Sequence, residues 1–529
     1  MTGARPATVY AVLLALAVLI FPYWGLGHVP PIQDAANLVA RASSRGLELQ
    51  HLRLREYVAF LRMDVNNLLS VVFFSLASLV VGPGRAAWGW GWAALVGVWF
   101  LAARAAEARH PAERPLLASV VFFSFTPLVF RPGGLLDQRF DPAAVLAASA
   151  AVFALLVDRP LAAAWLSLLA MLSKGPAVSV VALAWIAAFV TGIQGPGRLV
   201  ARVRSRPWAW AAVAAASLGY AGLALRDVIA YNLSAIAAST PAAQTSAFFV
   251  TAPGRVWKTA SFYPSALLLH SPASWLVVAS AVGIVVRPPR QRQPDPRRRI
   301  FFGLLLLVLV DLVFSATPPP AAVLVVWLAP ALFVLCVAVV GALPPLRGRA
   351  VLVTVLSTLV LSFQIYGHAV GASGIGPQAA AALPALAADA DALAGALRRR
   401  PMERHVVIAT NVLYAPLPDL AYNCDVLRVL LYERLGRPSP ALDGWTLGSW
   451  GDDWRAEMEA LPADAAYLTL LSVGGRDVVH HRGQAGRIAA EFLALVNPGC
   501  AVPVPDLLGR PELGHVRAYL TSADLKSCR

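Results

Sequence analysis

Twelve apolar runs follow one another through the first 370 residues of the chain, most of them separated by short links. A helix that crosses a bilayer needs about 20 consecutive, mostly apolar residues, and several of these runs reach that length. The chain is 58% hydrophobic and 14% charged, which is more apolar than a water-soluble protein can bury. The sequence therefore predicts a polytopic α-helical membrane protein. The runs lie near residues 9–27, 67–83, 87–104, 115–131, 142–157, 160–173, 176–195, 207–225, 273–287, 300–316, 320–344 and 350–370.

The arginines of the links indicate how these runs cross the membrane, because cytoplasmic links carry an excess of Lys and Arg. Twelve full spans would place the basic link 104–114 outside. Eleven spans, with 67–83 lying in or dipping into the outer leaflet, place 17 arginines in short cytoplasmic links. The run 9–27 is interpreted as a span, since it lacks the small-residue cleavage site of a signal peptide. We expect about eleven spans, a cytoplasmic N-terminus and external segments at 28–86, 132–141, 226–272 and beyond 370.

Residues 371–529 have a different composition from the rest of the chain. Residues 1–370 carry 29 basic and 12 acidic side chains, whereas the tail carries 15 and 17. Helix-like and strand-like segments alternate in the tail, which is typical of an α/β fold. We therefore expect a transmembrane domain at 1–370 and a small soluble α/β domain at 371–529, on the periplasmic side of a bacterial inner membrane. Strands are expected at 406–410, 466–471 and 515–521, and helices near 378–400, 419–436, 452–461 and 484–496.

The basic side chains stand in short links between apolar runs and not on a soluble face, so no nucleic-acid partner is expected. The segment 47–58, with mixed apolar and basic residues, suits a helix on the membrane surface or a solvated connector. In the oxidising exterior, Cys500 and Cys528 are the preferred disulfide pair.

Among the acids in segments predicted to lie at the outer face, four are candidate site residues. Asp34 is the first acid of the chain and follows the first apolar run, and Asp64 precedes the second. Asp137 and Asp141 stand in one external link. A positioned carboxylate can act as general base toward an acceptor hydroxyl, so these acids are candidates for a catalytic site. Each acid taken alone has the alternative interpretation of a solvated loop charge, and their convergence on one side favours the site.

Cations are expected at the same face. Lys174 lies at the outer end of a pair of runs, and Arg255 and Lys258 lie in the segment 226–272, followed by Tyr263. An enzyme that uses a lipid-linked phosphate must bind that anion at the membrane interface, for which Lys and Arg are suited. Asp311 is an acid within a span, and such acids are usually functional or paired.

Several short motifs stand in order along residues 8–345. Gln33-Asp34-Ala35-Ala36 opens the first external segment, and Ser173-Lys174-Gly175-Pro176 opens a later run. Tyr263-Pro264 approaches a span that begins near Trp275, and Phe314-Ser315 precedes another external segment. This pattern resembles the GT-C glycosyltransferases of the bacterial protein-mannosyltransferase and lipid A aminoarabinose transferase type. That family has an Asp-Glu pair where this chain has Asp34 alone, and a lysine after the Phe-Ser segment that is absent here.

The resemblance implies transfer of a sugar from a polyprenyl-phosphate donor, with inversion, on the outer face of the membrane. The acceptor would be a lipid, a glycan or a protein. By the same resemblance Asp34 is the base, Lys174 a structural or donor-phosphate residue, and Asp137 or Asp141 the family's acid after the third span. Asp64 is the nearest match to a Glu-Lys-Pro motif found in some relatives. A divalent metal ion is left open as a cofactor.

Two other classes of function remain alternatives. One is a multi-spanning transporter or lipid flippase with an external α/β cap, although the sequence contains no internal repeat and no corresponding pair of broken spans. The other is a relative that has lost activity, because the second acid after Asp34 is missing. Transfer of a sugar to a supplied acceptor would distinguish a glycosyltransferase from both of these alternatives.

Overall fold

The structure is a computed structural model, and it is mostly helical. It divides into two compact units, which are described separately. The first contains Leu61–Ser70 and Trp92–Tyr366, and the second contains Tyr23–Phe60, Val71–Gly91 and Gly367–Arg529, as far as they are described. The described residues are 34–63, 67–128, 134–135, 139–238, 260–286, 296–315, 322–342, 349–370, 377–398, 405–410, 424–446, 466–473, 501–504 and 515–521.

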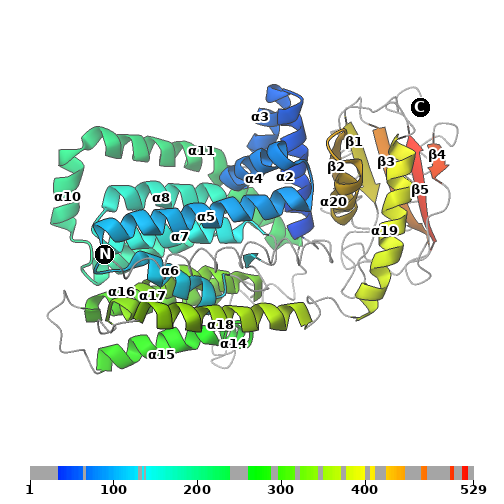
Figure 1. Cartoon of the computed structure of the whole chain (residues 1–529). Helices are drawn as coiled ribbons and strands as arrows, with labels where there is room; N and C mark the ends of the chain where they lie inside the picture. The colour runs from blue at the N-terminus through cyan, green and yellow to red at the C-terminus, as the bar shows by residue number, and fades with distance from the viewer. Residues whose placement is uncertain are drawn as a thin grey trace. The chain divides into compact units, whose positions relative to one another are not determined.

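Helices make up the first unit (Figure 1). Several of them, among them α6, α7, α8 and α10, have a proline in their first two positions, where the missing N–H costs no hydrogen bond. The helices are α5 (Arg85–Arg109, from Trp92 on), α6 (Pro115–Phe125), α7 (Asp141–Leu156), α8 (Pro160–Ser173), α9 (Ala177–Val190), α10 (Pro196–Ser205), α11 (Pro207–Ala238), α14 (Phe262–His270), α15 (Ala273–Val286), α16 (Pro296–Ser315), the 3₁₀ helix η3 (Ala322–Leu328), α17 (Ala329–Ala342) and α18 (Arg349–Val370).

Helix α17 forms the centre of this unit. Nearly all its side chains are buried, and it packs against α6, α7, α15 and α16. Aromatic rings join it to its neighbours: Phe333 lies 4.9 Å from Phe122 and 5.4 Å from Trp99 between ring centroids. A helix that is apolar all round belongs in the interior of a large helical assembly or in a bilayer.

Two helices in the described part of the chain are long and apolar enough to cross a membrane, Arg85–Arg109 and Leu324–Ala342. A third candidate is the pair Phe262–Leu269 and Ala273–Val286, which is bent by 115°. Shorter apolar helices, such as α8 with 14 residues, are about 21 Å long, less than the roughly 30 Å of a bilayer core. The eleven spans therefore stay a prediction. These shorter helices are Leu68–Val81, Pro115–Phe125, Asp141–Leu156, Pro160–Ser173, Ala177–Val190 and Ala350–Ser362.

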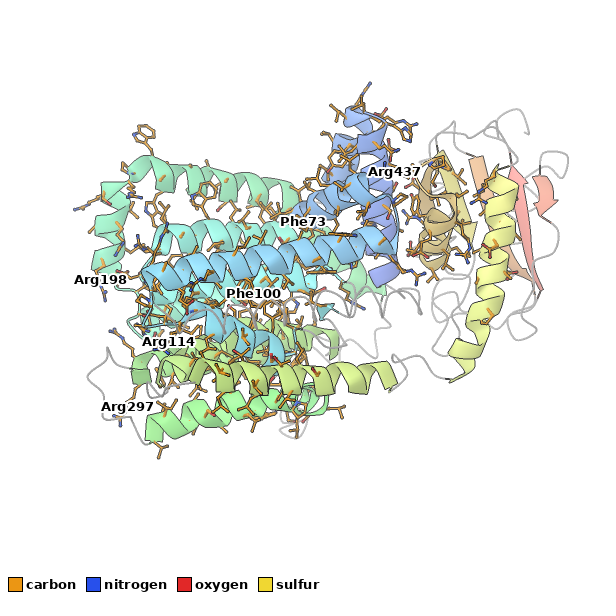
Figure 2. All side chains as sticks on the ribbon, in the orientation of Figure 1. Phe73, Phe100, Arg114, Arg198, Arg297 and Arg437 are labelled. Carbon is orange, nitrogen blue, oxygen red and sulfur yellow. The ribbon has the colours of Figure 1, made fainter. Side chains whose placement is uncertain are left out.

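Arginine-bearing links gather at one end of the first unit, where Arg114, Arg198 and Arg297 lie in Figure 2. Their contacts hold the links together: Arg202 pairs with Asp158, and the Arg298 Nε donates to the Thr191 carbonyl at 2.6 Å. We call this the arginine end, comprising residues 104–114, 157–159, 191–206 and 296–299. It is the end at which α7 finishes and α8 begins.

The second unit contains a five-stranded sheet with strand order β2-β1-β3-β5-β4. β1 runs parallel to β2 and β3, and β5 runs antiparallel to β3 and β4. The three predicted strands are present, whereas β2 and β4 were not predicted. The predicted helices near 452–461 and 484–496 lie outside the described residues. The predicted Cys500–Cys528 disulfide also lies outside them. The elements of the tail are α19 (Pro377–Arg398), β1 (His405–Thr410), α20 (Cys424–Leu435), β2 (Ala441–Thr446), β3 (Ala466–Val473), β4 (Ala501–Val504) and β5 (His515–Thr521).

Helix α20 is fixed to strand β2 through both backbone groups of Leu442. The Tyr432 hydroxyl accepts the Leu442 N–H at 2.7 Å, and the Arg428 Nε donates to the Leu442 carbonyl at 2.8 Å. Burial raises the pKa of Tyr432 to about 12, so its hydroxyl stays protonated at neutral pH. Burial alone would lower the pKa of Arg428, but Asp425 and further neighbours outweigh it and raise that pKa. The Tyr432 hydroxyl also donates to the Leu442 carbonyl at 3.2 Å, so both side chains keep the donors that their hydrogen bonds to this carbonyl require.

The helix α2 (Asp34–Gln50) and most of α3 (Leu54–Met63) and α4 (Leu68–Val81) belong to the second unit as well. α2 packs against α20 and β2, and its Gly46 lies so close to α4 that an added Cβ would meet the Ser78 Cβ at 2.5 Å. The predicted boundary at 370 assigns 28–86 to the transmembrane domain, whereas the contacts group α2 with the tail. The segment 47–58 is divided between α2 and α3 by a turn in which Leu52 has φ 56°.

Helix α20 also contacts the turn between α4 and α5. The Arg85 guanidinium makes a two-pronged ion pair with Glu433, and the Arg437 guanidinium donates to the Val80 carbonyl at 2.7 Å. The Arg85 and Glu433 side chains are 16% and 22% exposed, so water screens this pair less than a surface pair.

We predict that Arg85→Glu and Glu433→Arg each destabilise the protein by about 2 kcal/mol, because each brings two like charges together in a partly buried place. The double exchange should recover most of that loss, since it restores the pair with reversed polarity. Thermal unfolding of the detergent-solubilised full-length variants measures both effects. The exposed pair Arg104–Glu107 is the control, and its exchange should change stability little. A double exchange as unstable as the sum of its singles would mean that the pair is not coupled.

Candidate functional site

Asp141 is a buried carboxylate in the first turn of α7, where the helix dipole favours a negative charge. Its residue is 4% exposed. The Trp327 indole Nε1 donates a hydrogen bond to its Oδ1 at 3.1 Å, and the Lys174 Nζ lies 4.0 Å from its Oδ2. Among the described residues the Oδ2 atom has no hydrogen-bond partner. Three segments that are distant in sequence therefore meet at one acid.

Lys174 is positioned by the end of α8. Its backbone is extended, with φ −164°, and its N–H donates to the Ala170 carbonyl, which closes the helix. The carbonyl of the preceding Ser173 accepts a hydrogen bond from the Ser70 hydroxyl at 2.9 Å. The turn through Pro176 then leads directly into α9. The Lys174 side chain is 23% exposed, so its ammonium group lies between the buried acid and the surface.

Trp327 connects this acid to a second candidate, Tyr263. The Trp327 ring stacks on Phe314 with an interplanar angle of 12°, and Phe314 lies 6.5 Å from Tyr263 between ring centroids. Trp327 and Tyr263 are both fully buried. A buried tryptophan normally finds an acceptor for its N–H, and here that acceptor is a carboxylate.

The pair Asp141–Lys174 lies at the opposite end of α7 and α8 from the arginine end. The two helices pack side by side and are joined by a tight turn at 157–159, so α7 begins where α8 finishes. A helix of 16 residues separates the two ends by about 24 Å. The two ends of this helix pair therefore differ, with arginines at one end and the acid–lysine pair at the other.

The other predicted site residues are placed less fully. Asp34 is the first residue of α2, in the second unit, and its side chain is not described. Asp311 accepts a hydrogen bond at 3.4 Å from Ser315, one turn further along α16, a partner that the sequence did not identify. The predicted residues Asp64, Asp137, Arg255 and Lys258 lie outside the described residues.

The chemistry of the Asp141–Lys174 pair favours an anion as its ligand. Lys174 has three ammonium protons, and the nearest described carboxylate oxygen is only at ion-pair distance, so donors remain for a further oxygen. Asp141 holds the ammonium in place by charge while Trp327 holds Asp141 by hydrogen bonding. A phosphate that approaches from the exposed side of Lys174 would therefore meet a pre-positioned cation.

The described residues do not form a metal centre. No group of three His, Cys, Asp or Glu side chains lies close enough within this part of the chain to hold an ion. At the site itself one carboxylate stands beside an ammonium, which repels a divalent cation.

Comparisons of the chain with protein-family models, with curated proteins and with solved structures found no match. The likeness to GT-C glycosyltransferases therefore depends on the sequence motifs. The contact between Asp141 and Lys174 is a separate observation, because it depends on how α7, α8 and η3 pack and not on the order of the motifs.

Proposed function

We propose that the chain is an inverting GT-C-type membrane glycosyltransferase that uses a polyprenyl-phosphate-linked sugar as donor. The observation that carries the proposal is the Asp141–Lys174 pair at the end of α7 and α8 remote from the arginine end. If the arginine end is cytoplasmic, as the charge bias of membrane proteins indicates, the pair lies at the outer face. A lipid-linked phosphate at that face would find its cation there.

The proposal includes a fold in finer detail. About eleven spans would cross a bacterial inner membrane, with a cytoplasmic N-terminus and a soluble α/β domain in the periplasm. Supporting this, the described part of the chain contains three candidate spans at most and six shorter apolar helices, and the tail contains the five-stranded sheet.

In the proposed reaction, Asp34 accepts the proton of an acceptor hydroxyl. The freed oxygen attacks the anomeric carbon of the sugar from the face opposite the phosphate, and the bond from that carbon to the phosphate oxygen breaks. The leaving polyprenyl phosphate gains negative charge as this bond breaks, and Lys174 binds it. Stabilising charge that develops in the transition state lowers the barrier. Arg255 and Lys258 are proposed as further phosphate ligands, with Asp64, Asp137 and Tyr263 near the same face.

The proposal is tested with purified full-length protein in nanodiscs and a panel of polyprenyl-phosphate sugars. We expect one donor to raise the unfolding temperature and to be converted to polyprenyl phosphate. A ligand at 100 times its dissociation constant stabilises the folded state by about 2.7 kcal/mol, which a thermal shift detects. The sugar-free lipid phosphate and a nucleotide sugar are the controls. Absence of stabilisation by every donor contradicts the proposal, and donor-independent solute flux in liposomes would indicate a transporter.

A further inference from the structure

Helix α10 is a short helix at the arginine end that runs across the ends of its neighbours (Figure 1). It lies between α9 and α11, and a glycine and a proline at residues 195 and 196 set its start. None of its residues is buried. A helix of this kind, which lies across a helical assembly and is open to its surroundings, suits the plane of a membrane interface.

The sequence of α10 separates apolar and basic side chains. Leu199 and Val203 are one turn apart and only partly exposed, whereas Arg198 and Arg202 are one turn apart on the adjoining side and exposed. Val200 is 49% exposed beside this apolar stripe. Such a distribution lets the apolar side enter lipid while the guanidinium groups stay at headgroup level.

The arginines of this segment have little negative charge near them. Residues 191–225 contain four arginines and no acid. Arg202 pairs with Asp158, but within the described part of the chain no ion pair is formed by Arg198, Arg204 or Arg206. Three exposed guanidinium groups are therefore available to a ligand.

Further features extend this basic surface. Arg114 and Arg297, from two other links, lie at the same end of the unit in Figure 2. Trp208, just after α10, is 87% exposed, and tryptophan is enriched at the level of lipid headgroups. The surface thus combines positive charge with an aromatic side chain.

We propose that α10, with Arg198 and Arg204, and the residues Arg206 and Trp208 that follow it form an interfacial anchor that binds the headgroups of anionic phospholipids. Charge complementarity identifies the occupant, because a neutral headgroup would gain nothing from three unpaired guanidinium groups. A bilayer also supplies the acyl region that Val200 and Trp208 need. The inference rests on the membrane-spanning fold of the proposed function and not on sugar transfer.

The test uses the detergent-solubilised full-length protein, with phosphatidylglycerol or phosphatidylcholine added in increasing amounts and the unfolding temperature measured. We expect phosphatidylglycerol to stabilise the wild type selectively. In Arg198→Gln/Arg204→Gln/Arg206→Gln the concentration for half the effect should rise at least about tenfold, since each arginine near a charged surface contributes roughly fivefold. The matched Lys variants at these three positions keep the charge and should stay close to wild type. If the triple variant does not fold, Arg204→Gln alone should raise that concentration by about fivefold.

Three outcomes would overturn the anchor: an unchanged lipid response in the Gln variants, equal stabilisation by phosphatidylcholine, or equal stabilisation by inorganic phosphate. The last would identify a free-anion site. Donor turnover is measured in parallel in phosphatidylcholine nanodiscs. If the wild type shows no turnover but is selectively stabilised by phosphatidylglycerol, the proposed function fails while the anchor is supported.

Discussion

Replacing Asp34 by asparagine should lower donor turnover by about 10²- to 10⁴-fold, because the acceptor hydroxyl then loses the carboxylate that takes its proton. Asparagine has nearly the same shape and remains compatible with the start of a helix, so α2 should still form. Binding of the donor depends on cations and should persist. Turnover and donor-induced thermal stabilisation, measured on the same nanodisc preparation, therefore separate the two roles.

Glu56→Gln is the matched control for this substitution. Glu56 is an exposed acid in the first turn of α3, in the same segment that is predicted to be external, and its removal should leave turnover unchanged. Normal turnover in the Asp34 variant would mean that another group is the base. Asp137 and Asp141 would then be tested, with Asp141 placed second because it is already engaged by Trp327 and Lys174.

The sequence predicted that Asp141 and Lys174 lie at the same face of the membrane, because the charge bias of the links puts both at one end of neighbouring predicted spans, but it did not predict that the two residues form a pair. Local composition and charge bias indicate on which side of a membrane a loop lies, whereas the contact between two loops depends on how the helices pack. The sequence did not distinguish Asp141 from Asp137. A local signal for choosing Asp141 is its position in the first turn of a helix, after Phe140, because acids are favoured there.

Trp327 could not be found in the same way. It is 186 residues from Asp141 in sequence, and its contact depends on η3 lying against α7. The only signal is chemical: a tryptophan within an apolar run needs an acceptor for its N–H. Many backbone carbonyls would satisfy that need, so the sequence offers no reason to choose a carboxylate.

The association of α2 with the tail was also beyond the sequence. Its contacts with α20 and β2 join residues almost 400 positions apart, and packing of that kind leaves no local pattern. Gly46 is the one indication, because a glycine inside a helix often marks a close approach of another backbone. The strands were predictable, since β-branched runs such as Val406-Val407-Ile408 are typical of buried parallel strands.

Lys174→Met should weaken donor binding by about 10- to 150-fold, which corresponds to the loss of one charge-assisted hydrogen bond of about 1.5–3 kcal/mol. The same change leaves Asp141 buried without its cation, so the protein should also lose up to about 3 kcal/mol of stability. Lys174→Arg keeps the charge and should retain most binding. Donor titration by thermal shift, with turnover on the same samples, measures both effects.

Asp141→Asn, alone and combined with Lys174→Met, forms a double-mutant cycle with Lys174→Met. It keeps an oxygen for the Trp327 N–H while removing the charge that holds Lys174. This variant should bind donor more weakly than wild type but less weakly than Lys174→Met. In the double variant the stability lost in Lys174→Met should return, since no unpaired buried charge remains. Donor binding should stay at the level of Lys174→Met alone, because Asp141 acts on the phosphate through Lys174. Additive losses in binding would instead mean that Asp141 contacts the donor directly, and unchanged binding in Lys174→Met would remove the pair from the site.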